Sequence, residues 1–470
     1  MMNMNYNNAQ IREIVTTSSS NNNKDRRIVV GIQKKRYFVY IGLFILMFIN
    51  YLDRVNLSVA AKSIAESYSL SPIDMGYIFS AFLWTYLVCL IPMGLLADRF
   101  GGRAITYATL GLWSVAGMWT GAATSYGSLF ASRLVLGVGE SASYPAGGKI
   151  IREWAPQSER GLAAAFLNCG AHAGLCVGSM VVGALVLQFG WRESFYFTGA
   201  LGVVMAIVWF AFYRRPEQAS WLSQSERDLI LSERRETAQR VATDMTQLTA
   251  LKGLLKSPSM WALALTQGCA GYTLYLFMTW LPSYLAATRG MDVLKTGLFS
   301  AIPYGVAAIL GLGLGWFSDR LLKKSGSSNA ERRKLIAVML LLSSVILATP
   351  FVESIWLIVA LFSISLACVA TAMAMNIALT ADRLTDGRYN GVATSLLIMG
   401  GNLFGTAAPI VTGYVVAATG GFSGAFLIAG VLLLGGAIVI LSGARNPIEL
   451  TNEPVVPTSG RTAQVAGRSS

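Results

Sequence analysis

The stretch Tyr37–Ala61, YFVYIGLFILMFINYLDRVNLSVAA, places an acid and a base inside an otherwise apolar segment. A helix of about 20 residues crosses a bilayer core, so this stretch is long enough to span. Asp53 and Arg54 lie within it, where an ionisable group costs at least about 2.5 kcal/mol unless it is paired, faces water or serves a function. A position at the membrane surface is the alternative. However, Asn50, Arg54 and Ser58 follow at intervals of four residues and form a polar stripe that a surface anchor does not need.

The composition indicates a polytopic membrane protein, because 54% of the 470 residues are hydrophobic and only 13% are charged. The net charge of +13 would also suit a nucleic-acid binder, but the basic residues occupy alternate loops instead of one patch. The five cysteines lie in apolar runs without metal-ligand spacing, and His172 is the only histidine. We therefore expect no nucleic-acid partner, no metal site, no resident cofactor and no enzymatic activity.

The apolar segments predict two sets of six membrane spans. We expect residues 1–36 to form a disordered cytoplasmic tail, residues 37–213 an N-terminal half, residues 214–256 a cytoplasmic linker, residues 257–445 a C-terminal half and residues 446–470 a second cytoplasmic tail. The predicted spans are Tyr37–Ala61, Met75–Ala97, Ile105–Thr124, Ser128–Ile151, Leu162–Leu187, Ser194–Tyr213, Met260–Ala287, Gly297–Leu322, Leu335–Val352, Ile355–Thr380, Gly391–Ala418 and Phe422–Leu441.

The loops test this topology. Basic residues concentrate in every second loop, on the side of the N-terminal tail. The positive-inside rule therefore places both termini and the linker in the cytoplasm. In the linker, Ser223-Gln224-Ser225-Glu226 is a capping-box pattern that predicts a short helix. Its simplest role is a tether between the halves.

An internal repeat supports the division into halves. Gly94-Leu95-Leu96-Ala97-Asp98-Arg99 ends the second span of the first half, and Gly315-Trp316-Phe317-Ser318-Asp319-Arg320 ends the second span of the second half. We therefore expect an all-α membrane protein of twelve transmembrane helices in two pseudo-symmetric six-helix halves. Such halves form the substrate site between them, near the bilayer midplane.

Several motifs resemble a known family. GLLADRFGGR (residues 94–103) resembles the signature loop of the major facilitator superfamily. INYLDRVNLSVA, MGYIFSAFLWTYLVCLIPMGLLADRFGGR, ASRLVLGVGESASYPA and FMTWLPSYL resemble, more narrowly, the anion:cation symporter family. That family includes bacterial galactonate, glucarate and hexuronate transporters and sialin-like carriers. The resemblance covers about Tyr37 to Arg445, and it implies a carrier of organic anions driven by a proton gradient in a cell membrane, with a bacterial inner membrane favoured.

The resemblance also implies residue roles. Asp53 and Glu140 would carry the coupling protons, Arg54 would meet the substrate carboxylate, and Arg133 would be the charge partner of the acid on its own helix. Further matching positions would line the substrate site: Tyr51, Tyr86, Gln267, Tyr275 and Asn402. Tyr275 stands where the sugar-acid carriers tend to have Trp, and the alignment needs a gap near Asn402. One departure is clear: those carriers have a Gln in the fifth helix, where this chain has Gly170-Ala171-His172. Losing that amide removes one donor and one acceptor for a hydroxyl-rich ligand.

The spacing of the fourth span agrees with a charged site. Arg133, Gly137 and Glu140 follow at i, i+4 and i+7, so they share one helix face. An arriving anion could compete with Glu140 for Arg133, which would change the proton affinity of the acid. A static pair that pins two helices is the alternative. Arg54 suits a carboxylate because its planar guanidinium can donate two parallel hydrogen bonds.

The remaining polar residues allow two further hypotheses. His172 lies one turn after Asn168 and is a candidate proton relay, with a packing residue as the alternative. Charged residues at the cytoplasmic ends of the repeated helices are expected to form a conformational latch: Asp98, Arg99, Arg103, Asp319 and Arg320.

Together these observations predict a proton-coupled symporter that imports an organic carboxylate by alternating access. A sugar acid (hexonate, hexuronate or aldarate) is the favoured substrate, with aromatic or small dicarboxylic acids left open. An anion exchanger, an exporter and a membrane sensor that binds without transport are the alternatives. We expect a monomer.

Overall fold

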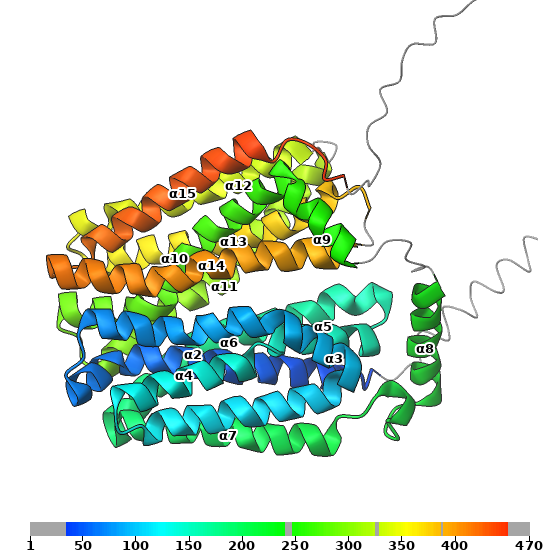
Figure 1. The fold of residues 1–470 in the computed structure, drawn as a ribbon, viewed down its shortest axis with the longest axis horizontal. Coiled ribbons are helices and arrows are strands. Elements are labelled where there is room, and N and C mark those ends of the chain that lie inside the picture. The colour runs from blue at the N-terminus through cyan, green and yellow to red at the C-terminus, as the bar shows by residue number, and fades with distance from the viewer. Residues whose placement is uncertain (1–33, 240–246, 325–328, 387–388, 450–470) are drawn as a thin grey trace, which may run out of the picture.

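The computed structural model describes residues 34–239, 247–324, 329–386 and 389–449. Within these ranges the chain is helical, and its only extended pairing is an isolated bridge between Leu384 and Ile448. The helices run back and forth between two ends of the molecule, in two halves that lie side by side (Figure 1). Most of the two predicted tails, residues 1–33 and 450–470, lies outside the described residues.

The two halves have the predicted helical content. The first half contains α2 (Tyr37–Tyr68), α3 (Pro72–Ala122), α4 (Tyr126–Glu140), α5 (Ser143–Trp154), η1 (Gln157–Glu159), α6 (Arg160–Phe189) and α7 (Trp191–Phe212). The linker contains η2 (Pro216–Gln218), α8 (Gln224–Gln239) and α9 (Gln247–Lys256). The second half contains α10 (Pro258–Arg289), α11 (Val293–Lys324), α12 (Asn329–Ser343), η3 (Ser344–Phe351), α13 (Ile355–Arg383), α14 (Asn390–Thr419) and α15 (Ser423–Gly443).

These helices make twelve crossings. Nine helices of the described ranges are long and apolar enough to cross a membrane. One of them, α3, crosses twice, because it reverses at Gly101, whose φ of 85° lies in the region that favours glycine. Two further crossings are α10, with 32 residues, and the broken pair of α4 and α5, which is interrupted at Ser141 and Ala142. The predicted all-α architecture of twelve transmembrane helices in two halves is confirmed.

The first linker helix is docked on the N-terminal half. Arg36, just before α2, forms ion pairs with Glu226 of α8 at 2.8 Å and with Glu159 of η1 at 2.7 Å. The hydrogen bond to Glu159, and to a lesser extent that to Glu226, raises the pKa of Arg36. The predicted capping box is only half formed: the backbone N–H of Glu226 donates to Ser223 Oγ at 3.4 Å, whereas the Glu226 carboxylate binds Arg36. The end of the molecule that carries α8 and α9 (Figure 1) is called the linker end below, and the opposite end the far end.

Contacts between the halves gather toward the far end. A Cβ on Gly76 of α3 would lie 2.7 Å from the carbonyl oxygen of Pro409 of α14, and a Cβ on Gly413 of α14 would lie 2.5 Å from that of Pro72. The two helices therefore approach each other through reciprocal glycine contacts. Ser80 of α3 adds a hydrogen bond of 2.8 Å to the carbonyl of Thr406 in α14.

The helices α6 and α11, which face each other across the two halves, show where the halves separate. On α6, Ser179 and Gly183 are buried, and a Cβ on Gly183 would lie 3.3 Å from Gly297 Cα of α11. Residues 168, 172, 179 and 183 share one helix face, yet His172 is half-buried and Asn168 is exposed. The same face is thus covered by α11 near the far end and uncovered near the linker end. The halves are in contact at the far end, apart from a pocket of about 200 Å³ between α2 and the adjoining parts of α10 and α11, and they diverge toward the linker end.

Candidate functional site

A buried ion pair lies at the centre of the molecule. Arg54 Nε of α2 donates to Glu140 Oε2, the last residue of α4, at 2.7 Å, and the side chains are 4% and 0% exposed. The pair is only partly satisfied, because Arg54 Nη2 and Glu140 Oε1 are buried without a partner. Arg54 therefore keeps a free donor in a site that is shielded from water, where a carboxylate would bind strongly.

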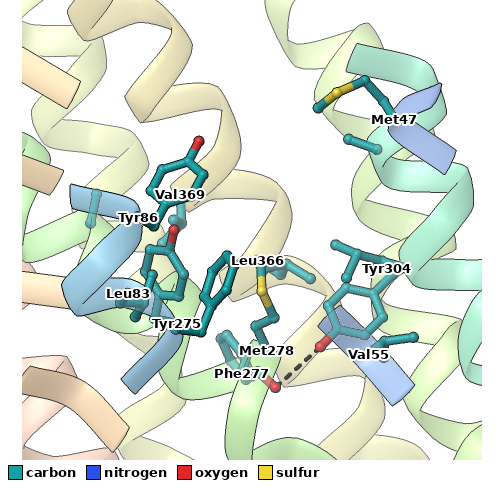
Figure 2. Packing of buried hydrophobic residues seen from close by; sticks show 14 of the residues in the cluster. Met47, Val55, Leu83, Tyr86, Tyr275, Phe277, Met278, Tyr304, Leu366 and Val369 are labelled. Carbon is teal, nitrogen blue, oxygen red and sulfur yellow. Dashed lines mark hydrogen bonds between the residues drawn. The ribbon is translucent and has the colours of Figure 1, made fainter. Parts of the chain in front are cut away.

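Aromatic rings surround the Arg54 guanidinium. Its central carbon lies 4.7 Å from the ring centroids of Tyr51 and Phe82 and 5.0 Å from that of Tyr86. Tyr275 of α10 approaches from the other half, and its ring lies near that of Tyr86 in Figure 2. Ring faces stabilise a cation, so this aromatic cage holds the guanidinium in place. A small pocket between the halves opens onto the cage and is lined by Arg54, Phe82, Arg133, Tyr275 and Thr279, among others.

The second arginine is placed differently from the prediction. Arg133 of α4 is buried and lies 5.8 Å from the centroid of Phe82, but no carboxylate of the described residues is within ion-pair distance of it. In this conformation Glu140 pairs with Arg54 instead, because α4 ends at Glu140 and presents that carboxylate to α2. Arg133 and Glu140 both face the carboxyl group of Asp53. Two arginines and two acids therefore form one buried cluster.

The other predicted substrate residues lie around this cluster, with most of their polar atoms already engaged. The hydroxyl groups of Tyr51 and Tyr144 are 3.2 Å apart. Tyr275 donates to Asn402 Oδ1 at 3.1 Å. Gln267 is buried and its oxygen accepts a hydrogen bond of 2.9 Å from Asn376 of α13. The structure thus brings Tyr51, Tyr86 and Tyr275 toward Arg54, while Gln267 and Asn402 are buried in the C-terminal half and bonded to their neighbours there.

His172 and the predicted latch residues lie outside the cluster. Nδ1 of His172 donates to the carbonyl of Asn168 at 2.9 Å, which leaves Nε2 free as an acceptor in the neutral ring. Asp98 lies 3.5 Å from Lys149 of α5, and Arg103 donates to the carbonyl of Phe210, so both contact their own half. Arg99 lies over the neighbouring Phe100 ring, Arg320 is exposed, and the side chain of Asp319 lies outside the described residues. The relay and the latch stay predictions.

Some residues of the site were not predicted. Phe82 contacts both arginines, and Trp113 and Thr198 face Asp53. All three lie in apolar spans, where an aromatic or a Thr is ordinary, so the sequence carries no signal for them. Within the described ranges, no group of three His, Cys, Asp or Glu side chains could hold a metal ion.

A family model described as Major Facilitator Superfamily matches residues 43–327 and 327–464. The chain is 32% identical to a probable galactarate/D-glucarate transporter of Escherichia coli K12 over 87% of this chain and 92% of that one. It is 29% identical to a D-galactonate transporter of Escherichia coli O6:H1 over 87% and 95%, and 32% identical to a probable sulfoacetate transporter of Cupriavidus necator over 90% and 96%.

A solved structure has the same fold. A bacterial homologue of the human lysosomal transporter Spinster, in an inward-facing and occupied conformation, matches with a TM-score of 0.72 and 18% identity. The match covers 88% of this chain and 98% of that chain. At this identity the likeness concerns the fold alone.

Proposed function

Because the chain belongs to the major facilitator superfamily, a family of multi-pass membrane transporters rather than enzymes, we propose that it is a proton-coupled symporter that imports an organic carboxylate. Basic residues concentrated in the loops of the linker end support a cytoplasmic position for that end and for both termini. The far end would then face the outside, and a bacterial inner membrane is the expected location.

A sugar acid is the substrate class that the relatives favour, because their names include galactarate, D-glucarate and D-galactonate. The site supports such a ligand, because Arg54 Nη2 is buried without a partner and the phenol groups of Tyr51, Tyr86 and Tyr275 lie around it. The hydroxyls of Tyr51 and Tyr275 would exchange their present partners, Tyr144 and Asn402, for the ligand. The relative named as a probable sulfoacetate transporter supports a small organic anion as a second candidate.

The observation that carries the proposal is the charge balance of the buried cluster. With both acids ionised, the charges of Arg54 and Arg133 offset those of Asp53 and Glu140. A substrate carboxylate that binds Arg54 adds one negative charge, and an uncompensated buried charge costs several kcal/mol. Protonation of one acid restores neutrality. Anion binding should therefore require at least one proton for each carboxylate, which is the basis of symport.

The conformation supports alternating access. The halves are in contact at the far end and diverge toward the linker end, so the cluster lies behind the closed far end. We propose that this is the inward-facing state, and that the opposite state forms when the glycine contacts between α3 and α14 and between α6 and α11 separate.

Uptake into proteoliposomes tests the proposal. The purified protein is supplied with galactarate, D-glucarate, D-galactonate, sulfoacetate, an aromatic acid or succinate, with and without an inward proton gradient. We expect accumulation of a sugar acid that collapses when the gradient is dissipated. Asp53→Asn and Glu140→Gln should abolish accumulation.

Other outcomes identify the alternatives. Uptake that needs a counter-anion inside but no gradient would indicate an exchanger. Binding without flux would indicate a sensor. Wild-type accumulation by both acid variants would refute proton coupling through Asp53 and Glu140.

A further inference from the structure

Asp53 and Arg54 are neighbours in the chain, but they face different surroundings. Arg54 lines the pocket between the halves, whereas Asp53 is not among the residues that line it. The carboxyl group of Asp53 is buried inside the N-terminal half, where Trp113 of α3 and Thr198 of α7 are directed at it. Its two oxygens and Trp113 Nε1 have no partner at ordinary hydrogen-bond geometry in this conformation.

Glycines bring these groups together. A Cβ on Gly139 of α4 would lie 2.8 Å from Trp113 Cβ, so α4 passes directly beside the indole. A Cβ on Gly199 of α7 would lie 2.8 Å from the carbonyl oxygen of Ser114, so α7 approaches the same part of α3. Trp113 and Thr198 thus lie on two helices, α3 and α7, that are in close contact with each other.

Thr198 is also the first member of a buried polar chain. Asn56 of α2 donates to Thr198 Oγ1 at 3.2 Å, and Ser194 Oγ of α7 donates to Asn56 Oδ1 at 2.8 Å. All three side chains are fully buried. This chain holds the Thr198 oxygen in place as an acceptor, while its hydroxyl donates at 3.4 Å to the carbonyl of Phe195 in its own helix. That bond is long, so the hydroxyl could turn to an ionised Asp53.

The charged groups that face Asp53 come from α4 alone: Glu140 and Arg133. From α3 and α7 it meets the neutral groups Trp113 and Thr198. The α6 helix packs on α2 through Gly170, Gly174 and Gly178, which carry no titratable group. From α10, Tyr275 faces Arg54.

We propose that Trp113 and Thr198 are positioning residues for proton coupling: they donate hydrogen bonds to ionised Asp53 and so set the pH at which it releases its proton. This proposal rests on the proposed function. The indole N–H and the Thr hydroxyl can each donate a hydrogen bond to an ionised carboxylate, whereas a protonated Asp53 accepts at only one of its oxygens. Because a donor stabilises the charged form of a carboxyl group, losing it favours the protonated form.

The test is the pH profile of uptake. Trp113→Phe keeps an aromatic ring but removes the donor. Hydrogen bonds to charged groups are worth about 1.5–3 kcal/mol, so the pH at which proton-driven uptake falls to half should rise by about one to two units. The maximal rate should fall because proton release slows, while KM for the substrate stays unchanged, since Arg54 is untouched.

A matched control separates this role from packing. Trp209 of α7 is equally buried, and its Nε1 also lacks a partner, but it lies about 16 Å along the helix from Thr198 and stacks on Tyr213. Trp209→Phe should leave the pH profile in place. Thr198→Val should shift it in the same direction as Trp113→Phe, and Thr198→Ser should restore it.

Three results would overturn the inference: an unshifted profile in both Trp113→Phe and Thr198→Val, an equal shift in Trp209→Phe, or a lower rate at every pH without a shift. The thermal unfolding temperature of each variant shows whether it is folded. If Trp113→Phe does not fold, the comparison of Thr198→Val with Thr198→Ser tests the inference. If the wild-type protein shows no gradient-driven uptake, the proposed function fails. If the wild type shows it and Asp53→Asn removes it, an unshifted profile refutes the positioning role alone.

Discussion

The far-end contact between α3 and α14 predicts how one methyl group changes the conformational equilibrium. In Gly76→Ala, the new Cβ would lie 2.7 Å from the Pro409 carbonyl oxygen and 3.2 Å from Ile410 Cα. Both neighbours are backbone atoms, so no flexible side chain can move away. Overpacking of this kind costs about 1–3 kcal/mol, and it acts only when the far end is closed. Alanine also stabilises the helix by up to about 1 kcal/mol relative to glycine. This gain is the same in the closed and the open conformation, so it cancels in the equilibrium between them.

A shift of this size lowers the closed-to-open ratio at the far end by about 5- to 150-fold. Ser80 reports the change, because its hydroxyl is buried and bonded to Thr406 of α14. We introduce Ser80→Cys into a cysteine-free chain and measure its reaction with a membrane-impermeant maleimide added from outside. Gly76→Ala should increase the labelling rate. Gly111→Ala is the matched control, since a Cβ on Gly111 of the same helix meets nothing within 4 Å.

The reasoning would be refuted if Gly76→Ala and Gly111→Ala gave the same labelling rate as the parent in folded protein. An equal increase in both would show that helix propensity, and not the contact with Pro409, controls the equilibrium. Gly413→Ala, which makes the reciprocal contact, should behave like Gly76→Ala.

Three further predictions address the site and the linker. Arg54→Lys should weaken substrate binding by about 10- to 100-fold, because an ammonium group cannot donate two parallel hydrogen bonds to a carboxylate; calorimetric titration measures it, and unchanged affinity would place the carboxylate elsewhere. Glu140→Gln should keep substrate counterflow but lose accumulation, and gradient-driven uptake at the wild-type level would contradict its coupling role. Arg36→Ala should lower the unfolding temperature, since it leaves the buried Glu226 without its ion pair at a cost of about 3–5 kcal/mol. The exposed pair made by Arg234 is the control, and its loss should cost at most about 1 kcal/mol.

The span pattern could be predicted from the sequence because length and apolarity are local properties. The features that the sequence did not predict depend on contacts with other parts of the chain. The fourth span was expected to be continuous from Ser128 to Ile151, but it breaks after Glu140. The pattern Ser223-Gln224-Ser225-Glu226 predicts a short helix, and α8 begins there, but the Glu226 carboxylate binds Arg36, from nearly two hundred residues earlier, instead of closing the capping box.

The candidate site shows the same limit. Helical spacing placed Arg133 and Glu140 on one face, and this is compatible with α4. Spacing within one helix does not determine which arginine a carboxylate meets across helices, and here Glu140 meets Arg54. The cage ring Phe82 carries no polar group, so the sequence offers nothing to distinguish it from a packing residue.

The two acids of the cluster are linked to the substrate in different ways. When a carboxylate takes Arg54 from Glu140, it leaves a fully buried carboxylate without its ion pair, and protonation is the least costly response. On the proposed function, Glu140 would therefore respond directly to the substrate. Asp53 does not line the pocket. Within the cluster it faces Arg133 and Glu140, and on its other side it faces Trp113 of α3 and Thr198 of α7. Successive residues of a helix are about 100° apart, so a movement of α2 that changes the surroundings of Arg54 also changes those of Asp53. We infer that Glu140 couples the proton to binding, while Asp53 couples it to the movement of the helices.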